Sequence, residues 1–154
     1  MSNLDDLYRE IILDHYRSPR NRGQLVSPPA HRVEGFNPLC GDEITIDLLV
    51  EGDAVVDLKL SGHGCSISQA SSSLMSVAVK GKSLDEVRHA ITEFKSMMLR
   101  HETSLSDEES TSQIARLREL GEIAALAGVV KFPVRIKCAT LAWNTLSQGL
   151  DELA

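Results

Sequence analysis

The chain has 154 residues, of which 42% are hydrophobic and 25% charged, a balance that excludes an intrinsically disordered or collagen-like protein. Its 16 Lys and Arg against 22 Asp and Glu give a formal net charge of −6, which argues against nucleic acid as the main partner because phosphate binding needs a basic face. Three cysteines cannot all pair into disulfides, and residues 1–6 do not resemble a signal peptide. No apolar run is long enough to span a bilayer. We therefore expect a cytoplasmic protein with no membrane partner.

The N-terminal segment predicts a helix followed by an irregular connection. Apolar residues recur at helical spacing from residue 4 to residue 12. Ser18 and Pro19 should end this helix, because the residue before a proline is pushed out of the helical conformation. Residues 19–29 are rich in Pro, Arg, Asn, Gly and Ser, so an irregular segment is expected there.

Three strands are expected next. Residues 31–36 should form a short edge strand. In residues 44–50 every second residue is apolar, which puts one face of a second strand on a core. A tight turn leads to a third strand, in which the residues expected to face the core are Val56, Leu58 and Leu60. The last two strands therefore form an antiparallel hairpin.

The apolar period then changes to that of helices. After a glycine-rich turn comes a helix whose expected core face consists of Ile67, Ala70, Leu74, Val77 and Ala78. Ser83 and Glu86 form a capping box that opens the next helix. Residues 102–112 are acidic and serine-rich and indicate an exposed loop or a frayed helix end. A short helix should follow and end at Gly128.

Pro133 lies near the start of a last helix, which completes the predicted fold. Because strands come first and helices follow, the fold class is α+β, with a small antiparallel three-stranded sheet and helices packed on one face. No internal repeat or linker divides the chain, so we expect one domain over residues 1–154.

Each of the three cysteines lies at a transition between predicted elements. Cys40 precedes the second strand, Cys65 begins a helix, and Cys138 lies in the first turns of the last helix. A single cysteine is usually a small buried hydrophobic residue. Here glycines stand beside Cys40 and Cys65, and helix N-termini favour the thiolate, which is the form that binds metals and attacks electrophiles.

Asp42 adds a fourth candidate ligand. It lies two residues after Cys40, so both side chains can turn to one point, and three thiolates with one carboxylate match the four ligands of tetrahedral zinc. The separations, 65 − 40 = 25 and 138 − 65 = 73 residues, are not those of a local zinc finger. Scattered structural cysteines therefore remain an alternative, and His63 competes with Asp42 for the fourth position.

Two cations lie close to the third cysteine. Lys137 precedes Cys138 directly and Arg135 lies three residues before it. Such residues usually form the solvated face of a helix. Alternatively, these two cations have a functional role, in which their positive charges stabilise thiolates or an anion carried on sulfur.

Four segments of the chain resemble the IscU/NifU-like iron–sulfur scaffold family, in order and over nearly the whole length. They are the residues around 14–23 (DHYRSPRNRG), 37–42 (NPLCGD), 62–73 (GHGCSISQASSS) and 132–138 (FPVRIKC). The resemblance implies an IscU-like fold. Lys137 stands where the cluster scaffolds commonly have a histidine, and the extra stretch around residues 100–113 is similar to the SufU branch of the family.

That branch implies a zinc-dependent sulfurtransferase, which accepts persulfide sulfur from a SufS-type cysteine desulfurase and serves downstream iron–sulfur assembly proteins. The implied catalytic residues are Cys40, as sulfur acceptor, and Arg135, in support. The implied Zn²⁺ ligands are Cys40, Asp42, Cys65 and Cys138, and His63 is then part of a loop.

Two other functions remain open. An iron–sulfur scaffold would use the same thiolates to hold iron and sulfide, although the ammonium group of Lys137 is not a ligand. A non-enzymatic protein would keep a closed structural zinc site. The acidic residues 107–109 are either a docking element or, more simply, part of a solvated loop.

Overall fold

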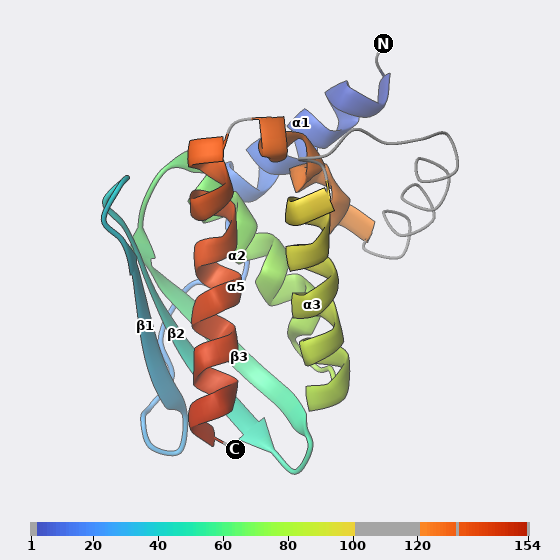
Figure 1. Ribbon diagram of the computed structural model, residues 1–154. Helices are drawn as coiled ribbons and strands as arrows, with labels where there is room; N and C mark the ends of the chain where they lie inside the picture. Colours follow the sequence, from blue (N-terminus) through green and yellow to red (C-terminus); the bar gives the residue numbers. More distant parts are fainter. Residues whose placement is uncertain (1–2, 101–120, 132, 154) are drawn as a thin grey trace.

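The computed structural model describes residues 3–100, 121–131 and 133–153 (Figure 1). The predicted loop at 102–112 and the acidic residues 107–109 lie outside this part. The described elements, in chain order, are α1 (Asn3–Arg17), β1 (His31–Asn37), β2 (Asp42–Glu51), β3 (Ala54–His63), α2 (Ser66–Val79), α3 (Leu84–Arg100), the 3₁₀ helix η1 (Gly121–Lys131) and α5 (Pro133–Leu153).

The three strands form an antiparallel sheet in the order β1-β2-β3, and helices lie on one of its faces (Figure 1). Helix α5 packs along β1 and β2, and α2 packs against β3. The predicted α+β class, with its small sheet and one-sided helices, is confirmed. Ile46 and Leu48 of β2 are fully buried on the face toward the helices, as the alternation of apolar residues predicted.

The connection between α1 and β1 protects the outer edge of β3. The amide of Gly23 donates to the carbonyl of Leu60 at 2.9 Å, and the amide of Leu60 donates to the carbonyl of Asn21 at 2.8 Å. An edge strand whose backbone groups are already paired does not offer them to another chain. The irregular segment predicted after Pro19 is thus part of the sheet's hydrogen bonding.

Two apolar residues expected in the core are exposed. The register between β2 and β3 shifts at Leu49/Val50, where Val50 pairs with Val55, so Val55 is buried and Val56 turns outward. In α2, Val77 is 50% exposed, because the buried face of that helix is filled largely by serines. An apolar period cannot detect a core-facing serine.

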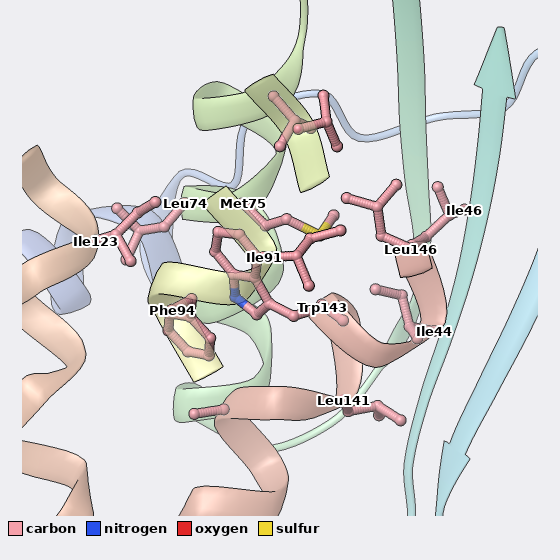
Figure 2. Packing of buried hydrophobic residues seen from close by; sticks show 14 of the residues in the cluster. Ile44, Ile46, Leu74, Met75, Ile91, Phe94, Ile123, Leu141, Trp143 and Leu146 are labelled. Carbon is pink, nitrogen blue, oxygen red and sulfur yellow. The ribbon is translucent and has the colours of Figure 1, made fainter. Parts of the chain in front are cut away.

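The hydrophobic core lies between the sheet and α2, α3, η1 and α5 (Figure 2). Phe94 of α3 and Trp143 of α5 stack with ring centroids 4.4 Å apart and planes 9° from parallel. Both rings are fully buried, and such a pair adds about 0.5–1.5 kcal/mol beyond the area it removes from water.

The buried serines of α2 connect the helices around it. The hydroxyl of Ser71 donates to the carbonyl of Ala139 at 2.6 Å and accepts from Trp143 Nε1 at 3.1 Å. Ser73 Oγ lies 2.7 Å from Nδ1 of the buried His15 and accepts from the amide of Arg20. These bonds attach α5 and α1 to α2, because a buried polar group needs a partner that water cannot supply.

The helix boundaries mostly follow the predicted signals. The capping box at the start of α3 is present in both directions, from Ser83 N to Glu86 Oε1 at 3.0 Å and from Glu86 N to Ser83 Oγ at 3.1 Å. The predicted short helix is a 3₁₀ helix that continues past Gly128 to Lys131. In the described ranges we find no helix with both the length and the apolarity needed to cross a bilayer.

Replacing Ser71 by alanine should destabilise the protein by about 1–3 kcal/mol, because the buried Trp143 N–H and Ala139 carbonyl would lose their shared partner. Urea denaturation measures this change. The matched control is Ser72→Ala, since the Ser72 hydroxyl donates to the carbonyl of Gln69 within its own helix. Equal stability losses for the two variants would contradict the bridging role of Ser71.

Candidate metal centre

Cys40 lies at the tip of the β1–β2 hairpin. Asn37 and Asp42 are paired across the two strands, so the four residues 38–41 form the connecting loop. The amide of Gly41 donates to the carbonyl of Asn37 at 2.8 Å, and Gly41 has φ +71°, a conformation that glycine adopts at little cost. The loop leaves the Cys40 thiol exposed and puts Asp42 at the first position of β2, where its side chain is fully buried.

Cys65 caps α2 and is tied to Asp42. Its Sγ accepts a hydrogen bond from the amide of Ser68 at 3.4 Å, and its own amide donates to Asp42 Oδ1 at 2.9 Å. A Cβ at Gly64 would lie only 2.6 Å from that carboxylate oxygen, so a residue without a side chain is required there. The second oxygen, Asp42 Oδ2, lies 4.0 Å from Cys65 Sγ.

Cys138, on α5, lies close to Cys40, Asp42 and Cys65. Its side chain is 1% exposed, and its Sγ lies 3.3 Å from Cys40 Sγ. Burial raises the pKa of the Cys138 thiol well above its usual range, and the neighbouring Cys40, Cys65 and Asp42 side chains raise it further. A cation bound beside Cys138 would offset this penalty and favour its thiolate.

The geometry brings four predicted ligands to one end of the sheet. The donor atoms of Cys40, Asp42 and Cys138 all lie within 4.8 Å of one another, and Cys65 adjoins them through its contacts with Asp42. Sulfur donors with one carboxylate form a set that suits Zn²⁺, since soft thiolates select for it and a carboxylate oxygen can complete four-coordination. The residues present thus fit a zinc ion by their chemistry.

His63, the competing fourth ligand, points elsewhere. Its side chain is 73% exposed, and Nε2 lies 2.7 Å from Glu43 Oε2. Arg135 and Lys137 are also exposed, in the first turns of α5 beside the group. Both lie within three residues of Cys138 along the chain, on the surface and not among the donor atoms.

Sequence reasoning gave no role to Asn37, although it stands in the first cysteine motif. Its side chain is 6% exposed, with Nδ2 3.9 Å from Cys138 Sγ and Oδ1 accepting from the amide of Leu39 at 3.2 Å. An asparagine followed by proline signals a turn, but only the tertiary structure shows that a distant cysteine lies against it.

Large apolar side chains are exposed near Cys40. Leu39 lies in the same loop, Phe36 precedes it on β1, and Val134 is at the start of α5; their exposed fractions are 64%, 59% and 61%. Because they lie close in the chain to Cys40 or Cys138, these side chains are candidates for contact with another protein.

Comparison with known proteins agrees with the fold and with the family resemblance. The family model for the NifU-like N terminal domain matches residues 7–139. The zinc-dependent sulfurtransferase SufU of Bacillus subtilis (strain 168) is 44% identical over 151 residues, which is 98% of this chain and 94% of that protein. The iron–sulfur cluster assembly scaffold protein IscU of Streptococcus pyogenes serotype M1 is 40% identical over 154 residues, 100% of this chain and 89% of that protein.

A crystal structure from Fervidobacterium islandicum AW-1, described as a candidate iron–sulfur cluster assembly scaffold for the SUF system, superposes with a TM-score of 0.76 at 34% identity. The match covers 92% of this chain and 94% of that one. The family model spans most of the chain, and relatives of nearly equal length match it from end to end. The chain belongs to the NifU-like N-terminal domain family.

Proposed function

We propose that this protein is a zinc-dependent sulfurtransferase, which accepts sulfur from the persulfide of a SufS-type cysteine desulfurase for iron–sulfur cluster assembly. The observation that carries the proposal is an exposed Cys40 thiol whose Sγ lies 3.3 Å from that of the buried Cys138, beside the Asp42 carboxylate. The similarity to the sulfurtransferase of Bacillus subtilis supports the same function.

The proposed Zn²⁺ ligands are Cys40, Asp42, Cys65 and Cys138. A bound zinc ion would supply the positive charge that keeps these thiols ionised at neutral pH. The chain fixes Asp42 through the amide of Cys65 and fixes Cys138 within a helix, whereas Cys40 stands on a short loop at the surface. Cys40 is therefore the ligand best placed to leave the centre and meet a donor.

In the proposed transfer the Cys40 thiolate attacks the outer sulfur of the donor's persulfide. A new sulfur–sulfur bond forms at Cys40, the sulfur–sulfur bond of the donor breaks, and the donor cysteine leaves as a thiolate. The transferred sulfur keeps its proton, so the products are a Cys40 persulfide and a free desulfurase thiolate. No net oxidation occurs, since one persulfide is exchanged for another.

We infer that the residues around Cys40 receive the desulfurase. The apolar side chains of Phe36, Leu39 and Val134 offer a contact surface, and Arg135 and Lys137 supply positive charge beside the reacting sulfur. Arg135, one turn before Cys138, is the proposed supporting catalytic residue, because a guanidinium can stabilise the negative charge of the thiolates that attack and leave during the transfer. Downstream iron–sulfur assembly proteins would then take the sulfur.

We also propose that residues 1–154 work as one cytoplasmic domain. The described strands and helices contribute to a shared hydrophobic cluster, and all three cysteines are free thiols, as a reducing compartment would keep them. The net charge of −6 supports a protein partner rather than nucleic acid.

A scaffold that builds iron–sulfur clusters is the second candidate, because scaffold proteins such as that of Streptococcus pyogenes are 40% identical to this chain. The exposed Lys137 beside the thiols does not favour it, since a lysine cannot take the place of a histidine ligand. A non-enzymatic protein with a structural zinc is the third.

Replacing Cys40 by alanine should abolish sulfur acceptance, because no other thiol of the group is exposed. Mass spectrometry after incubation with the desulfurase and cysteine measures the added sulfur. Binding of the variant to the desulfurase, followed by calorimetry, is the control and should persist. Sulfur loading of Cys40→Ala at the wild-type rate would remove Cys40 from the acceptor role.

Stripping zinc with a chelator should lower the melting temperature by about 5–10 °C, because a ligand present at 100 times its Kd contributes about 2.7 kcal/mol and the ion would join three separate segments. Differential scanning calorimetry measures the change, and added zinc should reverse it. The variant Cys65→Ser serves as the control and should respond little to the chelator. An unchanged wild-type melting temperature would argue against a zinc ion that joins the segments.

Protein purified without oxygen should contain about one zinc per chain and no visible absorption, as expected for a d¹⁰ ion held by thiolates. It should also stimulate desulfurase turnover several-fold, whereas Cys40→Ala should not. Iron and sulfide with visible absorption would favour the scaffold. Zinc without any stimulation would instead favour the structural zinc protein.

A further inference from the structure

Asn37 closes the Cys40 loop from the side of β1. Its Oδ1 accepts a hydrogen bond from the amide of Leu39 at 3.2 Å, and its carbonyl accepts from the amide of Gly41 at 2.8 Å. Both bonds lie within the loop, on either side of Cys40. The loop conformation therefore depends on a residue that is not itself a candidate ligand.

The same side chain reaches a sulfur from the far end of the sequence. Because Oδ1 must face the Leu39 amide to accept from it, the NH₂ group of Asn37 faces Cys138, with Nδ2 3.9 Å from Sγ. The large sulfur atom allows a longer donor distance than oxygen does. Asn37 is 6% exposed and Cys138 1%, so water does not compete for this contact.

We propose that Asn37 is a positioning residue of the metal centre, whose amide N–H orients the Cys138 sulfur as a ligand while its Oδ1 shapes the loop that carries Cys40. This inference rests on the proposed zinc function. Hydrogen bonds to a ligating sulfur fix its lone pairs and draw charge from it, and outer partners of this kind commonly change metal affinity 10- to 100-fold.

The two roles of Asn37 can be separated by substitution. In Asn37→Ser the hydroxyl oxygen can still accept from the Leu39 amide, as serine does in short turns, but no donor reaches Cys138. In Asn37→Ala both contacts are lost. The matched control is Asn144→Ser, which makes the same chemical change at an exposed position of α5.

Two readouts test the proposal without any measurement of sulfur transfer. Zinc affinity is measured by competition with a chromogenic chelator, and we expect a loss of about 10-fold or more in Asn37→Ser. Co²⁺ titration gives the sulfur-to-cobalt charge-transfer band, which should move to lower energy because a thiolate without its hydrogen bond gives up an electron more readily. Unfolding of the metal-free Asn37→Ser and Asn144→Ser proteins is measured in parallel, so that a loss of fold stability is separated from a loss of zinc affinity.

A charge-transfer band of Asn37→Ser at the wild-type energy would overturn the proposal, whether or not affinity falls, because Asn37 would then act on the loop alone. A wild-type protein that binds neither Zn²⁺ nor Co²⁺ would overturn the proposed function and this inference together. Metal binding in the wild type with identical behaviour of Asn37→Ser would overturn only the inference. The loss in Asn37→Ala should equal or exceed that in Asn37→Ser.

Discussion

The hydrogen bond from the Cys65 amide to the Asp42 carboxylate is the constraint on which the candidate metal centre depends. It joins the hairpin to the start of α2, at 2.9 Å, and the close approach leaves no room for a side chain at Gly64. A buried carboxylate with a fixed partner keeps one orientation, because leaving either group unpaired would be costly. The remaining oxygen, Asp42 Oδ2, is then directed toward the sulfurs.

The sheet and α5 supply the rest of the centre. The pairing of Asn37 with Asp42 sets the length of the loop, and the packing of α5 along β1 and β2 carries Cys138 to within 3.3 Å of Cys40. The anchoring of α5 in turn involves Trp143, which stacks on Phe94 and donates to Ser71. The core and the candidate centre are thus linked, because the same helix contributes a proposed ligand and a central part of the core.

The local parts of this structure could be predicted because their signals are local. Alternation in β2, the capping box at Ser83 and the turn at Pro19 depend on a few neighbouring residues. Val56 could not be placed, because the register shift that exposes it depends on how β2 pairs with β3. Val77 was wrongly predicted to face the core for a related reason. Buried serines, such as Ser71 with its hydrogen bond to the Ala139 carbonyl, fill much of the α2 face where apolar side chains were expected. The positions of the cysteines at element boundaries, together with Asp42, suggested a metal site, but the proposed role of Asn37 required the distance to a residue 101 positions away.

The short hairpin loop limits how far the Cys40 sulfur can travel. Both ends of the four-residue loop are held by strand pairing, and the Gly41 amide closes it again from within. Rotation of the Cys40 side chain changes the direction of the thiol far more than its position. A long flexible loop could carry its thiol over a wide distance to a donor, whereas this four-residue loop cannot. Any molecule that exchanges an atom with Cys40 must therefore bring its own reacting group down to the end of the sheet.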